Sequence, residues 1–264
     1  MPPAFRLGLA TRGNTHPQPD DVLLALDRGI NYWNWCGHDD GMSEAIRQLG
    51  PRRAKVIVAT QLVVNDLSRD QMRRKIERTL KSLATDWIDI ATLYYVESER
   101  EWNQIVATDG AIEALIEAKE QGLVRSIGLT THQRPLAAQW AESNRLDMLM
   151  VRYNAAHRGA ETEVFPVTDR LRLPVTCFTC LRWGALLEST ASDPAGFEIP
   201  AAAQWYRFVL SNPSVSVALM APDNRDELVE VLSLLDDWNE LPLDQRHQME
   251  AHGDRVREVA GPFP

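Results

Sequence analysis

The chain has 264 residues, of which 44% are hydrophobic and 25% are charged, a composition typical of a globular protein with one large core. The net charge at pH 7 is −9, and Lys and Arg cluster only in short helical runs, so nucleic acid is not an expected partner. No apolar run approaches the ~20 residues that cross a bilayer, and no basic segment followed by an apolar one opens the chain, so we expect a cytoplasmic protein without membrane association.

Eight short apolar runs are distributed along the chain, and each is predicted to form a β-strand. None exceeds nine residues, and each is mostly apolar, as is typical of parallel strands that are buried on both faces. The predicted strands are residues 5–11, 30–35, 55–62, 87–95, 124–131, 146–154, 174–180 and 215–222.

Amphipathic helical segments separate the predicted strands. The first begins at Asp20 and ends at Gly29, another ends at Gly122, and an extra helix covers about residues 243–259. This alternation predicts a single α/β domain over residues 1–264, with the strands closed into a (β/α)8 TIM barrel. An open doubly wound sheet is the competing architecture. In a barrel the functional residues lie where the strands end and the following loops begin.

Six segments of the chain, in order, resemble those of the aldo/keto reductase family. The first segment is GINYWN at 29–34 together with GMSE at 41–44, and the second is ERTLKSLATDWID at 77–89. The others are QGLVRSIGLT at 121–130, VRYN at 151–154, LRWGALL at 181–187, and the last strand and helix at 217–230. The chain is thus similar to that family over most of its length, and the resemblance implies the family's barrel and its NADPH-dependent carbonyl reduction.

The resemblance also implies four catalytic positions, and this chain replaces the family residue at each of them. The family's Asp, Tyr, Lys and His donate a proton to the carbonyl oxygen, acidify the donor and orient the substrate. The Asp position is Asn34 and the Tyr position is Asp40, or Asp39 if one residue is inserted. The Lys position is Gln61 and the His position is Tyr94. The chain therefore lacks the cation that would acidify a phenol at this place.

The substitutions of Asp and Lys are coordinated. Removing one partner of a buried ion pair strands a charge at a cost of roughly 3–5 kcal/mol, whereas replacing both leaves a neutral pair. We therefore expect Asn34 and Gln61 to approach within hydrogen-bond reach, directly or through one water. We also expect them to converge with Tyr94 and Phe178 at one end of the barrel.

The positions that the resemblance assigns to NADP are partly replaced as well. Thr130, Thr131 and Met150 occupy the places that hold the nicotinamide carboxamide, and a Met cannot replace an amide as donor and acceptor. Asp223 occupies the place of a cation for the 2'-phosphate, which it would repel. The aromatic that stacks on nicotinamide and a glycine of the pyrophosphate loop are kept, as Phe178 and Gly184. NADP is thus the cofactor implied by resemblance, with its binding in doubt.

Further polar residues follow the predicted strands. His38 and the adjoining acidic pair 39–40 are either site residues or a turn with a helix N-cap. Arg152 shares a strand face with Met150 by period two, so it points into the barrel mouth and needs an anion, from Asp40 or from a ligand carboxylate or phosphate. A structural Arg–Asp pair is the alternative.

The three cysteines, Cys36, Cys177 and Cys180, are interpreted as packing residues. An offset of three in a strand places Cys177 and Cys180 on opposite faces, whereas a redox CxxC belongs at a helix N-terminus. A metal site at residues 38–40 lacks an established ligand pattern, and we predict no metal.

Three functions remain open from the sequence. The first is a family member with a small-molecule site at the C-terminal barrel face and altered or lost NADPH-dependent carbonyl reductase activity. The second is an active NAD(P)H oxidoreductase with a non-standard proton donor. The third is a non-redox enzyme, a lyase or isomerase, or a non-catalytic ligand-binding barrel. The expected partner is a small molecule, with an anion as one option, and the sequence predicts no oligomeric state.

Overall fold

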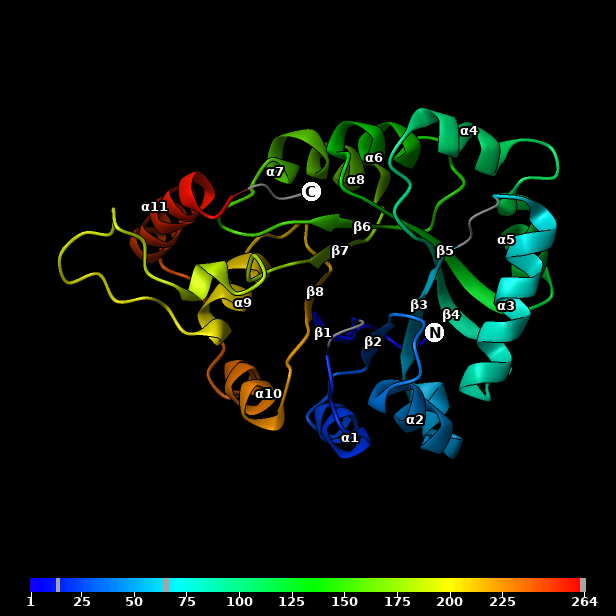
Figure 1. Ribbon diagram of the computed structural model, residues 1–264, viewed down its shortest axis with the longest axis horizontal. Coiled ribbons are helices and arrows are strands. Elements are labelled where there is room, and N and C mark those ends of the chain that lie inside the picture. The colour runs from blue at the N-terminus through cyan, green and yellow to red at the C-terminus, as the bar shows by residue number, and fades with distance from the viewer. Residues whose placement is uncertain (13–14, 64–66, 262–264) are drawn as a thin grey trace.

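The computed structural model describes residues 1–12, 15–63 and 67–261 and has the form of a barrel surrounded by helices (Figure 1). Within these residues, eight parallel strands pair in chain order and β8 pairs with β1, which closes the sheet. The predicted (β/α)8 barrel is therefore confirmed, and the open sheet is excluded. The strands are β1 (Leu7–Ala10), β2 (Tyr32–Trp35), β3 (Ile57–Leu62), β4 (Ile88–Leu93), β5 (Val124–Thr131), β6 (Met148–Arg152), β7 (Val175–Phe178) and β8 (Val217–Met220).

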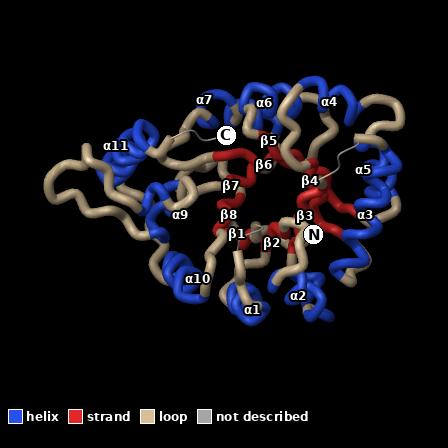
Figure 2. Tube along the Cα trace, in the orientation of Figure 1, coloured by secondary structure: helices blue, strands red, loops and turns tan. Residues whose placement is uncertain are grey.

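Helices cover the outside of the strand ring, as the tube view in Figure 2 shows. They bury apolar side chains of the outward strand faces, among them Trp33, Leu62 and Val151. The α-helices are α1 (Pro19–Asp27), α2 (Gly41–Gln48), α3 (Arg69–Leu83), α4 (Glu99–Val106), α5 (Ala111–Glu120), α6 (Arg134–Ala141), α7 (Ala160–Glu163), α8 (Phe165–Leu171), α9 (Ala202–Leu210), α10 (Arg225–Leu232) and α11 (Leu243–Val259). Short 3-10 helices are η1 (Gly50–Lys55), η2 (Ala185–Leu187) and η3 (Ser233–Leu235).

The lower half of the barrel interior is filled by side chains. Alternate strand residues point inward, and the hydroxyl of Thr176 donates to the buried Tyr32 hydroxyl at 3.3 Å across the interior. Gly128 is required here, because a Cβ at this position would lie 2.5 Å from the sulfur of Met148. The inward apolar residues of the lower half are Tyr32, Ile57, Ile90, Met148 and Val217, all buried.

A buried carboxylate joins three strands near their N-terminal ends. Asp89 is fully buried in β4, and its two oxygens each lie 2.8 Å from a guanidinium, of Arg53 and of Arg125. The backbone N–H of Val58 and the indole of Trp87 donate to the same carboxylate. Removing the charge of Asp89 leaves the buried guanidinium of Arg53 without compensation. Asp89 therefore stabilises the fold at the N-terminal face of the barrel, opposite the C-terminal ends of the strands.

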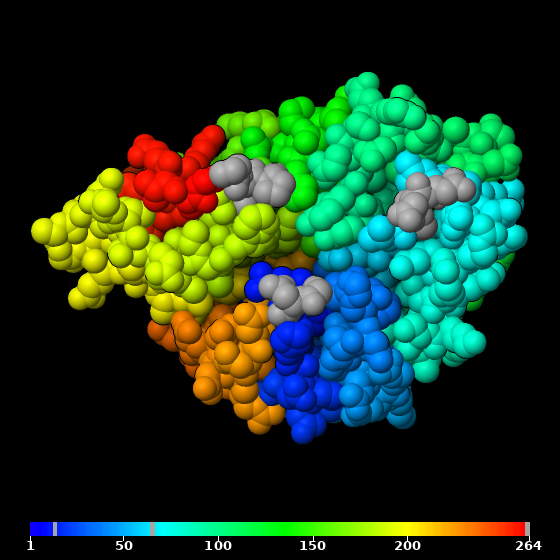
Figure 3. Space-filling view, viewed as in Figure 1, coloured from blue at the N-terminus to red at the C-terminus, as the bar shows by residue number. Residues whose placement is uncertain are grey.

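The last part of the chain covers one side of the barrel. Helix α11 occupies the range in which the sequence predicts an extra helix. Figure 3 shows the projecting segment that precedes α9, in yellow, beside α11, in red. Asp193 of this segment lies 3.0 Å from Nδ1 of His252 and accepts from Nε of Arg255 at 2.7 Å, which fixes the segment to α11.

Several predicted strands extend beyond the observed ones. The predicted strand 87–95 ends at Leu93 in the structure, and Tyr95 has a φ of 51°, a left-handed conformation that a strand cannot accommodate. Tyr153, just after the end of β6, is as buried as the strand residues, so an apolar pattern does not mark where a strand ends. Within the described residues, no helix is both long and apolar enough to cross a membrane.

Candidate functional site

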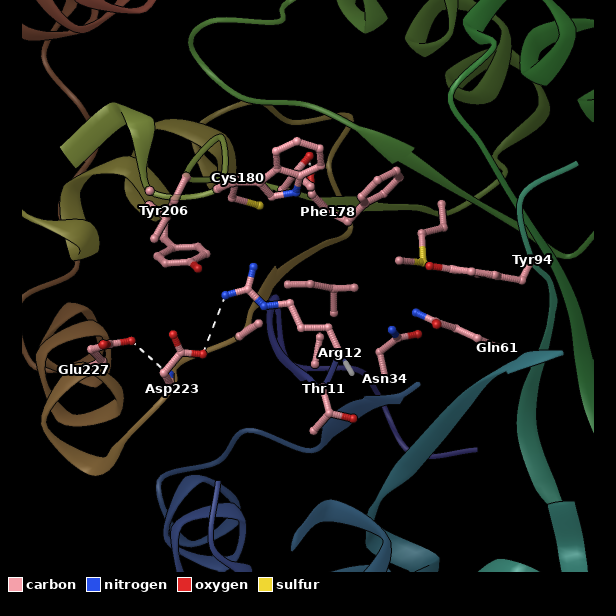
Figure 4. A pocket seen from close by; sticks show the side chains of 18 of the residues that line it. Thr11, Arg12, Asn34, Gln61, Tyr94, Phe178, Cys180, Tyr206, Asp223 and Glu227 are labelled. Carbon is pink, nitrogen blue, oxygen red and sulfur yellow. Dashed lines mark hydrogen bonds and ion pairs between the residues drawn. The ribbon is translucent and has the colours of Figure 1, made fainter. Parts of the chain in front are cut away.

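A pocket of about 360 Å³ opens at the C-terminal ends of the strands (Figure 4). It brings together Asn34, Gln61, Tyr94 and Phe178, as the sequence predicts, and it also includes Met150, Gly184 and Asp223. Each of the first four comes from the end of a different strand or the loop after it, which is how a barrel assembles a site. The remaining lining residues are Ala10, Thr11, Arg12, Tyr95, Thr179, Cys180, Leu181, Trp183, Leu187, Tyr206, Leu219, Ala221 and Glu227.

One end of the pocket consists of Asn34, Gln61 and Tyr94, whose side chains lie near one another in Figure 4. We call it the neutral end, because none of these three side chains is basic or acidic at neutral pH. Asn34 is 1% exposed, and neither its Nδ2 nor its Oδ1 has a hydrogen-bond partner among the described residues. Asn34 therefore presents an unused donor and an unused acceptor inside the barrel.

The structure shows no direct hydrogen bond between Asn34 and Gln61, so the direct form of the predicted contact is wrong, while a bridge through one water stays a prediction. Asn34 pairs in register with Ala59 of β3, and Gln61 lies two residues further along that strand. Two residues correspond to about 6.6 Å along a strand, so the two side chains leave the barrel wall at different heights.

Tyr94 is the phenol at the neutral end. Burial, followed by the neighbouring Tyr95, raises the pKa of Tyr94 well above its usual value. The two rings lie 3.9 Å apart between centroids. No lysine occurs among the described residues that line the pocket. The hydroxyl is therefore a neutral hydrogen-bonding group and a poor acid.

The opposite end of the pocket, here the charged end, contains Arg12, Asp223 and Glu227. Arg12 lies 3.6 Å from Asp223, and the backbone N–H of Asp223 donates to Glu227 at 2.9 Å. Arg225 nearby is paired with the carboxylate of Asp21. The nearest cations are thus already engaged by carboxylates, and a phosphate placed here would meet two negative side chains. This end fits a hydroxyl-bearing group better than a phosphate.

His38, Asp39 and Asp40 lie outside this pocket and line a second one with the start of α1, and Arg12 lines both pockets. The backbone N–H of Ser43 donates to the Asp40 carboxylate at 2.8 Å, so Asp40 is the N-cap of α2. Asp39 is paired with Arg47 at 2.9 Å. Of the two interpretations open from the sequence, the helix cap is the one the structure shows for Asp40, which does not line the pocket with Asn34.

Arg152, Thr130 and Thr131 are at the barrel mouth but outside the pocket lining. Arg152 is 8% exposed and follows Met150 on the inward face of β6. Burial, then the nearby guanidinium groups of Arg134 and Arg182, lowers the pKa of Arg152 to about 10. The Asp40 carboxylate that the sequence offered as its partner caps α2 instead.

Sequence reasoning missed two features. Arg12 is the second residue after β1, and its place just beyond a strand end is the signal that could have identified it. The second is an ordered pair at the mouth, in which Glu97 accepts from the backbone N–H of His132 at 3.0 Å and lies 3.1 Å from its Nδ1. The His132 ring lies 4.4 Å from the Tyr95 ring and 5.7 Å from that of Phe178.

The cysteines show no redox arrangement. Cys177 and Cys180 are buried and free, and burial raises the pKa of both thiols. Among the residues described, no three His, Cys, Asp or Glu side chains are grouped as ligands for a metal ion.

Comparison with known proteins gives the family of the chain. The profile of the aldo/keto reductase family matches residues 7–204. The methylglyoxal reductase DkgB of Salmonella typhi is 28% identical over 142 residues, which cover 51% of this chain and 49% of that protein, so the chain spans about half the length of the first curated relatives it matches. An NADH-specific methylglyoxal reductase of Escherichia coli is 22% identical over 87% of this chain and 70% of that protein.

Two solved structures share the fold. The aldo-keto reductase AKR11C1 of Bacillus halodurans, in its holo form, has a TM-score of 0.69 at 18% identity and covers 89% of this chain and 85% of its own. An aldo-keto reductase of Klebsiella pneumoniae in complex with NADPH has a TM-score of 0.74 at 21% identity and covers 95% of this chain and 92% of its own. The family match extends over most of the barrel, and this chain belongs to the aldo/keto reductase family.

Proposed function

We propose that this family member binds a small molecule in the pocket at the C-terminal barrel face and has lost the standard NADPH-dependent carbonyl reduction. The observation that supports this most directly is the neutral end of the pocket. Asn34, Gln61 and Tyr94 provide hydrogen bonds there without any cation, and burial raises the pKa of Tyr94. A carbonyl reductase needs a proton donor that is acidic enough to protonate the developing alkoxide.

The other candidate donor lies elsewhere. The Asp40 carboxylate accepts the N–H of Ser43 and contacts the Cys36 thiol at 3.8 Å, in the second pocket. Asp40 therefore acts as the N-cap of α2 and does not line the pocket that contains Asn34.

NADPH fits this pocket poorly. Phe178 and Gly184 line it and suit a stacked ring and a close backbone approach, but Met150 offers no amide to a carboxamide. At the charged end, Asp223 and Glu227 oppose a phosphate, and Arg12 is already paired. Each lost charge-assisted contact lowers affinity by roughly 1.5–3 kcal/mol, which is about ten- to a hundredfold.

A second candidate is an oxidoreductase with a non-standard donor. The Glu97–His132 pair favours it, because a carboxylate beside Nδ1 orients an imidazole and leaves Nε2 for proton transfer. The relatives named methylglyoxal reductases, one of them NADH-specific, make NADH and methylglyoxal the first reagents to test.

Fluorescence titration with NADPH and NADH, followed by turnover of an aldehyde panel that includes methylglyoxal, tests the proposal. We expect NADPH affinity weaker than micromolar and no turnover. Micromolar NADPH affinity with turnover above about 1 per second, an ordinary enzyme rate, would return the protein to the reductases. Turnover that is abolished by His132→Gln would instead identify the second candidate.

A further inference from the structure

We propose that the neutral end of the pocket binds the primary carboxamide of a ligand whose body is aromatic or apolar. This inference rests on the proposed function, because it takes the pocket as a ligand site, and it names the chemical class of that ligand. The geometry that supports it is the buried Asn34 amide with both of its polar atoms unpaired and directed into the pocket.

An unpaired buried amide is an exception that needs a physical reason. Buried polar groups almost always have partners, because leaving one unsatisfied forfeits its hydration. The chain satisfies another buried asparagine fully. Asn154 donates to the carbonyl of Thr179 at 2.8 Å and accepts the N–H groups of Ala156 and His157 at 3.0 Å each. Asn154 thus finds its partners within the protein, whereas Asn34 does not, and we infer that the donor and acceptor of Asn34 are available to a ligand.

The chemistry of the neutral end selects among ligand groups. A primary carboxamide offers one acceptor and two donors, so it can satisfy Oδ1 and Nδ2 of Asn34 together in a paired amide arrangement. A carboxylate or a ketone has acceptors only and would leave Oδ1 unsatisfied. A carboxylate would also bring a charge to a place where Gln61 and Tyr94 are neutral. Gln61 and Tyr94 line the same end of the pocket and offer further neutral donors and acceptors.

The walls next to the neutral end define the body of the ligand. Phe178, Met150 and Tyr95 line the pocket beside it and present ring and thioether surfaces. Phe178 and Met150 are buried, whereas Tyr95 is partly exposed at the mouth. Aromatic rings favour such surfaces through offset stacking and sulfur contacts. A ligand with a flat apolar body and a carboxamide at its inner end would therefore complement both the neutral end and the walls beside it.

Three small probes of nearly one shape test the inference: benzamide, acetophenone and benzoate. Each is titrated at millimolar concentrations into the full chain without nucleotide, and binding is followed by NMR chemical-shift changes. We expect benzamide to bind at least about tenfold more tightly than either of the others, because only benzamide satisfies both atoms of Asn34. Equal affinities, or no benzamide binding, would overturn the proposal.

Variants identify the residue responsible. In Asn34→Leu, and in Asn34→Ala as a second variant should the first fail to fold, benzamide and acetophenone should bind equally. The matched substitution Asn103→Leu, at an exposed position of α4, should keep the preference for benzamide. A preference that persists without Asn34 would overturn the assignment. Because these titrations contain no cofactor and no turnover, their outcome is independent of the aldehyde assay, so the two proposals can fail separately.

Discussion

Replacing Asn34 with leucine should stabilise the protein without its ligand. The substitution keeps the branching at Cγ and removes a donor and an acceptor that are buried and unpaired. Leaving a buried polar group unsatisfied costs about 1–3 kcal/mol, and the pocket provides space for the larger side chain. We therefore expect the free energy of unfolding to rise by about 1–3 kcal/mol. In a chain of this size each kcal/mol raises Tm by about 2–4 °C.

The same substitution at Asn154 is the matched control. Asn154 is as deeply buried but makes three hydrogen bonds, so Asn154→Leu leaves the backbone N–H of Ala156 unpaired and removes one partner each from the N–H of His157 and the carbonyl of Thr179. That variant should lose at least about 2 kcal/mol. Urea denaturation and thermal melts of both variants measure the difference. A destabilised Asn34→Leu, with an unchanged slope of unfolding against urea, would refute the reasoning that this amide is held for a ligand.

Three further substitutions test other parts of the structure. Asp89→Asn should lower the free energy of unfolding by about 3–5 kcal/mol in urea titrations, and a change below 1 kcal/mol would contradict the role assigned to this carboxylate. Burial and the neighbouring arginines lower the pKa of His157 from 6.5 to about 4, so the unfolded chain binds more protons between these values and stability should fall as pH drops from 6.5 towards 4. In urea titrations between pH 6.5 and 4, His157→Gln should flatten this fall in stability, whereas the control His38→Gln, at an exposed position, should not. Identical pH profiles for the two variants would exclude His157 as the source of the pH dependence. Asp223→Ser frees the guanidinium of Arg12, so NADPH affinity should rise at least about tenfold relative to NADH by fluorescence titration, and an unchanged ratio would show that the charged end does not meet the phosphate.

The barrel and the convergence of its site residues could be predicted from the sequence. Parallel strands that alternate with helices close in chain order, and the period of two places Met150 on an inward face, so topology brings strand ends to one rim. The family resemblance aligned Asn34, Gln61 and Tyr94 with that rim. The pocket contains all of them.

The features that could not be predicted depend on shifts of one or two residues in strand register and on the conformation of single loop residues. The register between β2 and β3 places Asn34 opposite Ala59, and no feature of the sequence states that register. The loop after β4 turns at Tyr95 with a positive φ, and this turn lets Glu97 meet the first residue after β5, His132. Side chains that meet through loops are fixed by tertiary contacts that local patterns do not encode.

The plug of side chains in the lower half of the barrel has a kinetic consequence. Tyr32, Met148 and the residues level with them fill the barrel below Asn34, so a ligand reaches Asn34 from the mouth of the barrel. A ligand that contacts Asn34 must enter through the mouth before a second ligand binds nearer to the mouth. It can leave only after that second ligand has dissociated. Binding of two ligands would therefore follow a compulsory order, with the inner one trapped. Dissociation of the inner ligand should slow as the concentration of the outer one increases.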